Sequence, residues 1–185
     1  MEIITRFAPS PTGYIHIGNV RSAIYPYLLA KQNSGKMILR IEDTDRARYV
    51  DGATELIENT LEWLGLNWDE GPIVGGDNGP YFQSERQDIY HEWARKLIAA
   101  GRAYADPTPP EMISEYRNKC NKDKIPFLYR NFRPTDTPEW QPGIPLRFKA
   151  HPKDYDWHDE VMGDMHAGPE TQDDIILIKK DGFPT

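Results

Sequence analysis

The sequence of 185 residues predicts an α/β protein in which helices cover a parallel sheet. In the first hundred residues, short apolar runs alternate with amphipathic stretches of helical length, and Gly or Pro marks most of the changes. A continuous apolar run returns at residues 174–178, as is typical of a buried parallel strand. Between these parts the chain is rich in proline and predicts shorter elements.

The first strand is expected at residues 3–7, before a loop punctuated by proline and glycine. Asn19 is predicted to cap a helix of residues 20–33, and Pro26 inside that helix predicts a kink or an early break. The positive end of the helix dipole would then face the loop, so an anion is expected to bind between His16 and Asn19. The same pattern also fits a plain strand-loop-helix turn with a surface histidine.

The next elements continue the alternation. Residues 37–41 predict a second strand, and the run Glu42–Asp45 follows its C-terminal end. Asp51 is expected to cap a second helix, and the capping-box pattern Ser84-x-x-Gln87 predicts the start of a third. Strands that alternate with helices of this length favour parallel pairing.

The sequence pattern changes beyond Tyr104, because prolines become frequent and rule out long helices and strands. A short helix is expected at residues 111–121, and residues 146–150 and 157–162 predict short strands of an antiparallel insert. The apolar run at residues 174–178 then predicts a return to the parallel sheet.

The net charge of −7 is unevenly distributed. Residues 102–153 carry ten Lys and Arg against six Asp and Glu, whereas the segments on either side are acidic. This middle segment fits a local phosphate-binding surface or an ordinary solvated face. Cys120 is the single cysteine, which excludes a disulfide framework and a Cys-pair zinc site. No apolar run is long enough to span a membrane and no secretory signal pattern occurs, so a cytoplasmic protein is expected.

Five segments taken together resemble the bacterial glutamyl-tRNA synthetases, which are class I aminoacyl-tRNA synthetases. They read R-F-A-P-S-P-T-G-Y-I-H-I-G-N from Arg6, L-R-I-E-D-T-D-R-A-R from Leu39, L-G-L-N-W-D-E-G-P from Leu64, Y-F-Q-S-E-R from Tyr81 and L-I-K-K-D-G-F-P-T from Leu177. The H-I-G-N segment corresponds to the H-I-G-H signature of the class, whose fourth position varies in this family.

This resemblance implies a Rossmann-like catalytic domain, with helices on both faces of its parallel sheet, that is split by an α+β insertion. By this analogy, residues 1–103 form the first half of the nucleotide-binding fold and residues 104–173 form the insertion, which binds the acceptor end of tRNA. Residues 174–185 would begin the second half. The implied activity is the ATP-dependent activation of L-glutamate as its adenylate, with Mg²⁺ accompanying ATP, and transfer of the glutamyl group to the 3′ end of tRNA(Glu).

The resemblance also assigns the ligand-binding residues. It places glutamate on Arg6, Ala8, Ser10 and Glu42, and ATP on Ser10, Thr12, His16, Gly18 and Asn19, with His16, Gly18 and Asn19 acting in catalysis. These residue types suit the task, because the planar fork of Arg6 grips a carboxylate and Glu42 can receive an ammonium group. Arg6 and Glu42 could also form a structural ion pair with each other.

The same analogy assigns nucleic-acid contacts to a set of polar and basic residues: Thr44, Asp45, Arg46, Arg48, Arg117, Lys119, Lys122, Lys124, Arg130, Arg133 and Arg147. No metal site is expected, because E-D-T-D lacks the glycine and the distal glutamate of a calcium loop. The resemblance implies no protein-bound zinc.

Several departures from the family limit these expectations. The tyrosine and arginine that complete the glutamate pocket in the family, and its anticodon-binding region, have no counterpart in the sequence. The K-x-S-K signature that closes on ATP in the family does not occur in the sequence. The sequence is therefore expected to be an N-terminal portion of such an enzyme, able to bind ATP weakly but not to complete aminoacylation alone. Two alternatives stay open: a stand-alone paralog of the glutamyl-Q type that glutamylates a modified tRNA base, and a non-enzymatic module that binds the tRNA acceptor end.

Overall fold

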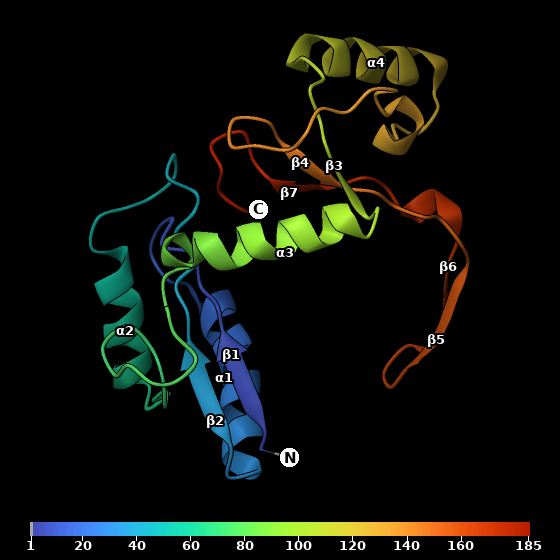
Figure 1. Ribbon diagram of the computed structural model, residues 1–185. Coiled ribbons are helices and arrows are strands. Elements are labelled where there is room, and N and C mark those ends of the chain that lie inside the picture. The colour runs from blue at the N-terminus through green and yellow to red at the C-terminus, as the bar shows by residue number, and fades with distance from the viewer. Residues whose placement is uncertain (1) are drawn as a thin grey trace. The chain divides into compact units, whose positions relative to one another are not determined.

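The computed structural model describes residues 2–185 and divides into two compact units (Figure 1). The first unit ends at Gln87 and the second begins at Asp88. These units do not coincide with the boundaries predicted at residues 103 and 173, so the division into two half-domains and an insertion stays a prediction.

The first unit is built around parallel strands, as the alternation of elements predicts. β1 (Ile4–Phe7) pairs in parallel with β2 (Lys36–Leu39), and α1 (Ile17–Gln32) connects them. On the other side of β2, isolated parallel bridges join this strand and its continuation to Glu70 and Phe82. β2 is therefore the central strand of the unit.

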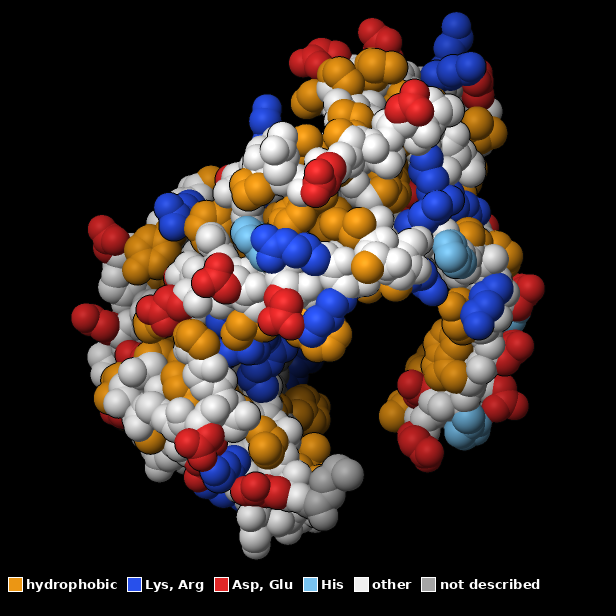
Figure 2. Space-filling view, viewed as in Figure 1, with side chains coloured by type: hydrophobic (Ala, Val, Ile, Leu, Met, Phe, Trp, Pro, Cys, Tyr) orange, Lys and Arg blue, Asp and Glu red, His pale blue; other side chains and the backbone are white. Residues whose placement is uncertain are grey.

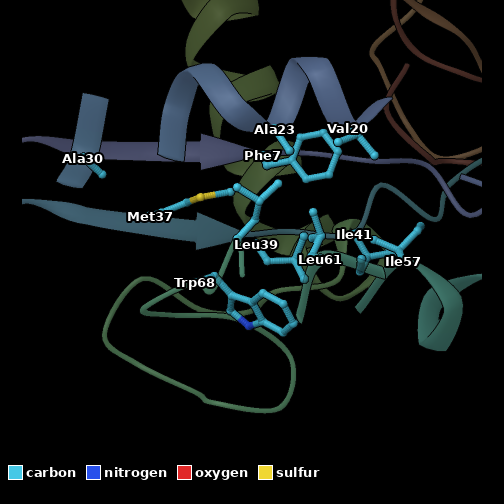
Figure 3. Close-up of a cluster of buried hydrophobic side chains, with 11 residues drawn as sticks. Phe7, Val20, Ala23, Ala30, Met37, Leu39, Ile41, Ile57, Leu61 and Trp68 are labelled. Atoms are coloured by element: carbon cyan, nitrogen blue, oxygen red, sulfur yellow. The ribbon is translucent and has the colours of Figure 1, made fainter. Parts of the chain in front are cut away.

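The core of the first unit lies between these strands, α1 and α2 (Ala53–Trp63), as Figure 3 shows. Its members are apolar residues that the strands and helices present at their own spacing, two residues in strands and three or four in helices. The buried cluster comprises Phe7, Val20, Ala23, Ala30, Met37, Leu39, Ile41, Ile57, Leu61, Leu66 and Trp68.

Helix α1 begins three residues before its predicted start. His16 is the N-cap, and Asn19, predicted as the cap, is the third residue of the helix. The helix continues through Pro26, so the predicted early break is wrong. A proline removes only one backbone hydrogen bond, and at this point the Thr5 hydroxyl of β1 donates to the Pro26 carbonyl at 2.8 Å, which ties the helix to the strand.

Glu70 organises the loop that follows it. The side chain is almost completely buried, and its carboxylate accepts hydrogen bonds from the backbone N–H of Asn78 (3.0 Å), the Asn78 amide (3.0 Å) and the Tyr81 hydroxyl (2.8 Å). The ammonium of Lys36 lies 3.2 Å from the same carboxylate. These bonds, that of the Asn78 amide first, lower the pKa of Glu70 from its ordinary value of 4.5 to about 2.

The second unit contains helices and antiparallel strands. In chain order its elements are α3 (Gln87–Ala99), β3 (Ala103–Ala105), α4 (Pro110–Asp123), the 3-10 helix η2 (Tyr129–Phe132), β4 (Leu146–Phe148), β5 (Tyr155–Asp159), β6 (Gly163–Ala167), the 3-10 helix η3 (Pro169–Thr171) and β7 (Ile176–Ile178). The expected short helix at residues 111–121 corresponds to α4, and the expected strand at residues 146–150 corresponds to β4.

The apolar run at residues 174–178 is not a parallel strand. β7 pairs antiparallel with β4, which pairs antiparallel with β3, so the sheet has the order β3-β4-β7. A short apolar run predicts a buried strand but not the direction of its partner. Here the burial comes from a small core that Ile178 shares with Leu146, Ala94 and Ala103.

The single strand predicted at residues 157–162 is a hairpin instead. β5 and β6 pair from Tyr155 opposite Ala167 to Asp159 opposite Gly163. The Asp159 carboxylate accepts from the backbone N–H groups of Val161 (2.9 Å) and Met162 (2.8 Å), which fixes a turn where a continuous strand was expected. Both faces of the hairpin are largely exposed, and Figure 2 shows acidic, histidine and hydrophobic side chains along it.

Within residues 2–185, no helix is both long enough and apolar enough to cross a membrane.

The Glu70 hydrogen bonds predict an acid-dependent loss of stability. Because the pKa of Glu70 is lowered on folding, its contribution is complete above pH 4.5 and is lost as the pH falls toward 2. Glu70→Gln should therefore be less stable than the wild type at pH 7, and the difference should shrink between pH 4.5 and pH 2. Urea unfolding followed by tryptophan fluorescence measures both curves, with Glu62→Gln, an exposed carboxylate, as control. A constant difference across this range would contradict the prediction.

Candidate functional site

A guanidinium and a carboxylate meet at the carboxyl ends of the two parallel strands in the first unit. Arg6 belongs to β1, and Glu42 lies just past the end of β2. Arg6 Nη1 lies 3.1 Å from Glu42 Oε1, and Arg40 Nη2 lies 3.6 Å from the same oxygen. All three side chains keep part of their surface in solvent. The structure thus brings together two residues that the sequence places 36 positions apart. They form with each other the ion pair that the sequence leaves open as the alternative to glutamate binding.

The loop between β1 and α1 encloses a small cavity beside these strand ends. Its volume is about 200 Å³. The lining residues are Pro9, Ser10, Thr12, Gly13, Tyr14, Ile15, His16, Asn19 and Ile57. Four of the five residues predicted to bind ATP, all except Gly18, therefore line one cavity. The loop is held to β2 because the Glu42 backbone N–H donates to the Pro9 carbonyl at 2.8 Å.

His16 caps α1 with its own side chain. Its Nδ1 accepts from the Gly18 N–H at 3.1 Å, and its backbone N–H donates to Asn19 Oδ1 at 3.1 Å, which completes a capping box. The N–H groups of Asn19 and Val20 donate to the His16 carbonyl. These helix N–H groups are therefore not free in the structure, in contrast to the anion site expected from the sequence. Because Nδ1 accepts, the ring proton lies on Nε2, which can donate to a ligand.

Ser84 bonds to Asp43, although the Ser84-x-x-Gln87 pattern predicts that it caps a helix together with Gln87. The Asp43 carboxylate accepts from the Ser84 backbone N–H at 2.8 Å and from the Ser84 hydroxyl at 2.6 Å. The predicted capping box of Ser84 with Gln87 is therefore wrong. Ser84 lies inside the 3-10 helix η1 (Gln83–Arg86), and a residue 41 positions earlier caps that helix.

The loop after Glu42 holds the first group of predicted nucleic-acid contacts. Thr44 is buried, and its hydroxyl donates to Gln83 Oε1 at 2.9 Å. Arg48 Nε donates to Asp45 at 2.7 Å in an exposed ion pair, and Arg46 is also exposed. The two arginines of this loop are therefore accessible, whereas Thr44 is part of the packing.

Arg147 lies inside the second unit. It is 8 % exposed, its Nε donates to Asp106 at 2.6 Å, and its guanidinium lies over the ring of Tyr129 at 3.5 Å. Burial opposes ionisation of Asp106, but hydrogen bonds led by that of Arg147 hold the pKa of this carboxyl below its ordinary value. Burial raises the pKa of Tyr129, whose hydroxyl also donates to Asp106, to about 12.

Two further arginines of the predicted set are held within the second unit in the same way. Arg133 donates to both carboxylate oxygens of Asp174, at 2.6 and 2.7 Å. The guanidinium of Arg130 donates to the backbone carbonyls of Pro169 and Gln172. The structure thus gives Arg130, Arg133 and Arg147 partners within the fold.

Arg117 differs from these three because it lies on the exposed side of α4, with its guanidinium carbon 4.7 Å from the centre of the Phe127 ring. The C-terminal half of α4 and the residue after it add Lys119, Lys122 and Lys124, all exposed. Figure 2 shows Lys and Arg side chains gathered at this end of the helix.

Among residues 2–185, no three or more His, Cys, Asp and Glu side chains gather in a way that could hold a metal ion.

The first unit places charged side chains at the carboxyl ends of neighbouring parallel strands, the edge at which open α/β sheets bind their ligands. The family model of the tRNA synthetases class I (E and Q), catalytic domain, matches residues 2–185. The chain belongs to this family, whose catalytic domain has a mixed α/β fold with a parallel sheet.

Known relatives agree with this assignment. The chain is 43 % identical to the glutamate–tRNA ligase of Clostridium kluyveri and 45 % identical to that of Dehalococcoides mccartyi, and all of it is covered in both comparisons. The crystal structure of the glutamate-tRNA synthetase from Elizabethkingia anophelis matches the whole chain with a TM-score of 0.88 at 37 % identity. The chain spans 39 %, 38 % and 40 % of the length of these three proteins.

The buried pairs predict that Asp106 is needed for folding of the second unit. Asp106→Ala leaves the Arg147 guanidinium without its carboxylate in the interior, which should lower the free energy of unfolding by about 3–5 kcal/mol. Urea unfolding measures this change, with Asp136→Ala, an exposed aspartate of the same unit, expected to stay within about 0.5 kcal/mol of the wild type. Equal effects of the two substitutions would show that the buried pair is not needed.

Proposed function

We propose that this chain forms the amino-acid-binding and ATP-binding part of a glutamate–tRNA ligase. The observation that carries the proposal is the contact of Arg6 with Glu42 at 3.1 Å at the carboxyl ends of β1 and β2. Two opposite charges that face each other at a partly open strand end match the two charges of an amino acid. The names of the relatives, all glutamate–tRNA ligases, support glutamate as that amino acid.

In this proposal glutamate inserts between the two side chains. The Glu42 carboxylate exchanges its contact with Arg6 for the substrate ammonium, and the Arg6 guanidinium binds a substrate carboxylate through its planar fork. Ala8 and Ser10 follow Arg6 along the chain and supply the adjacent wall of the pocket. A solved structure of this family, from Elizabethkingia meningosepticum, is described as a complex with its amino acid, which supports an amino-acid site in this fold.

ATP is proposed to bind at the loop between β1 and α1. The cavity lined by Ser10, Thr12 and His16 offers hydroxyl donors and the Nε2–H group, and the positive end of the α1 dipole favours phosphate. Gly18 and Asn19 lie at the start of this helix, where their N–H groups already bond to His16 and hold its ring beside the cavity. Mg²⁺ would arrive with ATP as part of the substrate.

The proposed reaction needs no protein nucleophile. A carboxylate oxygen of glutamate attacks the α-phosphorus of ATP, a new oxygen–phosphorus bond forms, and the bond to pyrophosphate breaks, so that pyrophosphate leaves with its Mg²⁺. A hydroxyl of the terminal tRNA ribose then attacks the activated carbonyl and releases AMP. The protein contributes by aligning the reacting groups and stabilising charge on the phosphate oxygens.

The second unit is proposed to bind the acceptor end of tRNA, as the acceptor-binding insertion of the family would. The exposed cations Arg117, Lys119 and Lys122 of α4 are the groups available for phosphates. In the first unit, Arg46 and Arg48 are exposed and are proposed as nucleic-acid contacts of that unit. Arg130, Arg133 and Arg147 are left out of this set because the fold occupies their guanidinium groups. We expect the reaction in the cytoplasm and without protein-bound zinc.

The glutamate site predicts a selective effect of Glu42→Gln. This substitution keeps the size of the side chain but removes the charge that binds the ammonium, so the affinity for L-glutamate should fall about 10- to 100-fold. The affinity for ATP with Mg²⁺ should not change. Isothermal titration calorimetry of the chain with each ligand measures both values, with Lys119→Ala as control. Unchanged glutamate affinity would refute the role of Glu42.

The acceptor-binding role predicts salt-dependent RNA binding. Fluorescence anisotropy with an acceptor-stem RNA hairpin that ends in CCA should show an affinity that falls as salt rises, and Lys119→Ala with Lys122→Ala should reduce the slope by about 1–2. Glu111→Gln with Glu115→Gln on the same helix serves as the matched control. RNA binding by a chain that binds neither glutamate nor ATP would favour the non-enzymatic module instead.

A further inference from the structure

The chain at the end of β2 is held from two sides. The N–H groups of Arg40 and Glu42 donate to carbonyls of the β1 side, those of Phe7 at 3.1 Å and Pro9 at 2.8 Å. Between them, the Ile41 N–H donates to the Tyr81 carbonyl at 2.9 Å on the opposite side. Alternate residues of this extended segment therefore face opposite neighbours, as in any strand.

Asp43, two residues after Ile41, also bonds on the side of Tyr81, but through its side chain and not its backbone N–H. Its two carboxylate oxygens accept from the N–H (2.8 Å) and the hydroxyl (2.6 Å) of Ser84. Phe82, the N-cap of η1, makes no side-chain capping bond, so Asp43 supplies the cap from another part of the chain. A carboxylate at the start of a helix is also favoured by the helix dipole.

Thr44 makes a further hydrogen bond between this segment and η1. Its hydroxyl donates to Gln83 Oε1 at 2.9 Å, and both residues are 7 % exposed. Asp43 and Thr44 are thus fixed to two consecutive residues of η1. Because these residues directly follow Glu42, they determine the direction in which the chain leaves the site.

We propose that Asp43 is a positioning residue for amino-acid recognition, acting through Glu42. Its bonds to Ser84 hold the backbone so that the Glu42 carboxylate stays beside Arg6, where the substrate ammonium is to bind. They also occupy the Asp43 carboxylate, so that it does not compete with Glu42 for the substrate ammonium. Glu42 alone then sets the position of the amino group. This inference rests on the proposed glutamate site.

Glutarate separates this role from a general structural one. It has both carboxylates of L-glutamate but no ammonium, so it cannot use Glu42. A residue that acts through Glu42 affects the binding of L-glutamate and leaves the binding of glutarate unchanged. A residue that only stabilises the fold affects both ligands alike.

The test is calorimetric titration of the chain with L-glutamate and with glutarate. Asp43→Ala should weaken L-glutamate binding about tenfold and change glutarate binding less than about twofold. In a double-mutant cycle the Asp43→Ala effect should disappear in the Glu42→Gln background, since the group through which Asp43 acts is already lost. Asp51→Ala, an exposed aspartate of the same unit, is the matched control.

A second pair of variants covers the case in which Asp43→Ala does not fold. Ser84→Ala keeps the backbone N–H bond to Asp43 and removes only the hydroxyl bond, so it should weaken L-glutamate binding about threefold, and Ser84→Thr should restore it. Equal loss for L-glutamate and glutarate, or no loss in either Asp43→Ala or Ser84→Ala, overturns the positioning role alone. A wild-type chain that does not prefer L-glutamate to glutarate overturns the proposed role of Glu42, and the inference with it.

Discussion

The candidate site depends on the hydrogen bonds that hold β2 from both sides. β1 lies along one side, and the segments near Glu70 and Phe82 lie along the other. A strand that is paired on both sides cannot shift its register without breaking two sets of bonds, and a shift of one residue would reverse every side chain. The position of Glu42 beside Arg6 therefore follows from backbone pairing as well as from the charges of the two side chains.

The second unit depends instead on charges that are removed from solvent. Asp106 and Asp174 are 3 % and 2 % exposed, and each holds an arginine from another part of the unit. Such pairs offset the loss of hydration only when their remaining hydrogen bonds are also made, as they are here. The excess of basic residues in this part of the sequence is thus partly internal, and a count of charges overestimates the surface available to a polyanion.

Local patterns predicted much of the fold. The parallel pairing of β1 and β2, helix α4 and strand β4 follow from apolar spacing and turn residues. The start of α1 was wrong by three residues because Asn19 was taken as the N-cap, whereas its side chain accepts from the His16 N–H as the third residue of a capping box. The turn after Asp159 was missed because it has no glycine pair at its centre: the Asp159 side chain accepts from Val161 and Met162, and Gly163 with a φ of 78° closes it.

The site was predictable only in part, and for a physical reason. The resemblance assigned Arg6 and Glu42 to one ligand, and in the structure the two side chains form an ion pair at 3.1 Å, while their role in binding stays a prediction. The partners of Asp43 and Arg147 lie 41 residues away in each case. Sequence patterns report neighbours within one or two turns of a helix, so a side chain that bonds over such a distance cannot be recognised until the fold is known.

The imidazole of His16 serves the helix with one nitrogen and can serve a ligand with the other. Both roles use the same ring. A substitution of His16 that loses phosphate affinity therefore has two effects at once, because α1 loses its N-cap and the ligand loses a hydrogen-bond donor. Asparagine is a strong capping residue, and its side chain ends too early to replace Nε2. The His16→Asn variant therefore keeps a cap on α1 while it removes the Nε2 donor, so the helix-capping role and the ligand-binding role can be measured separately.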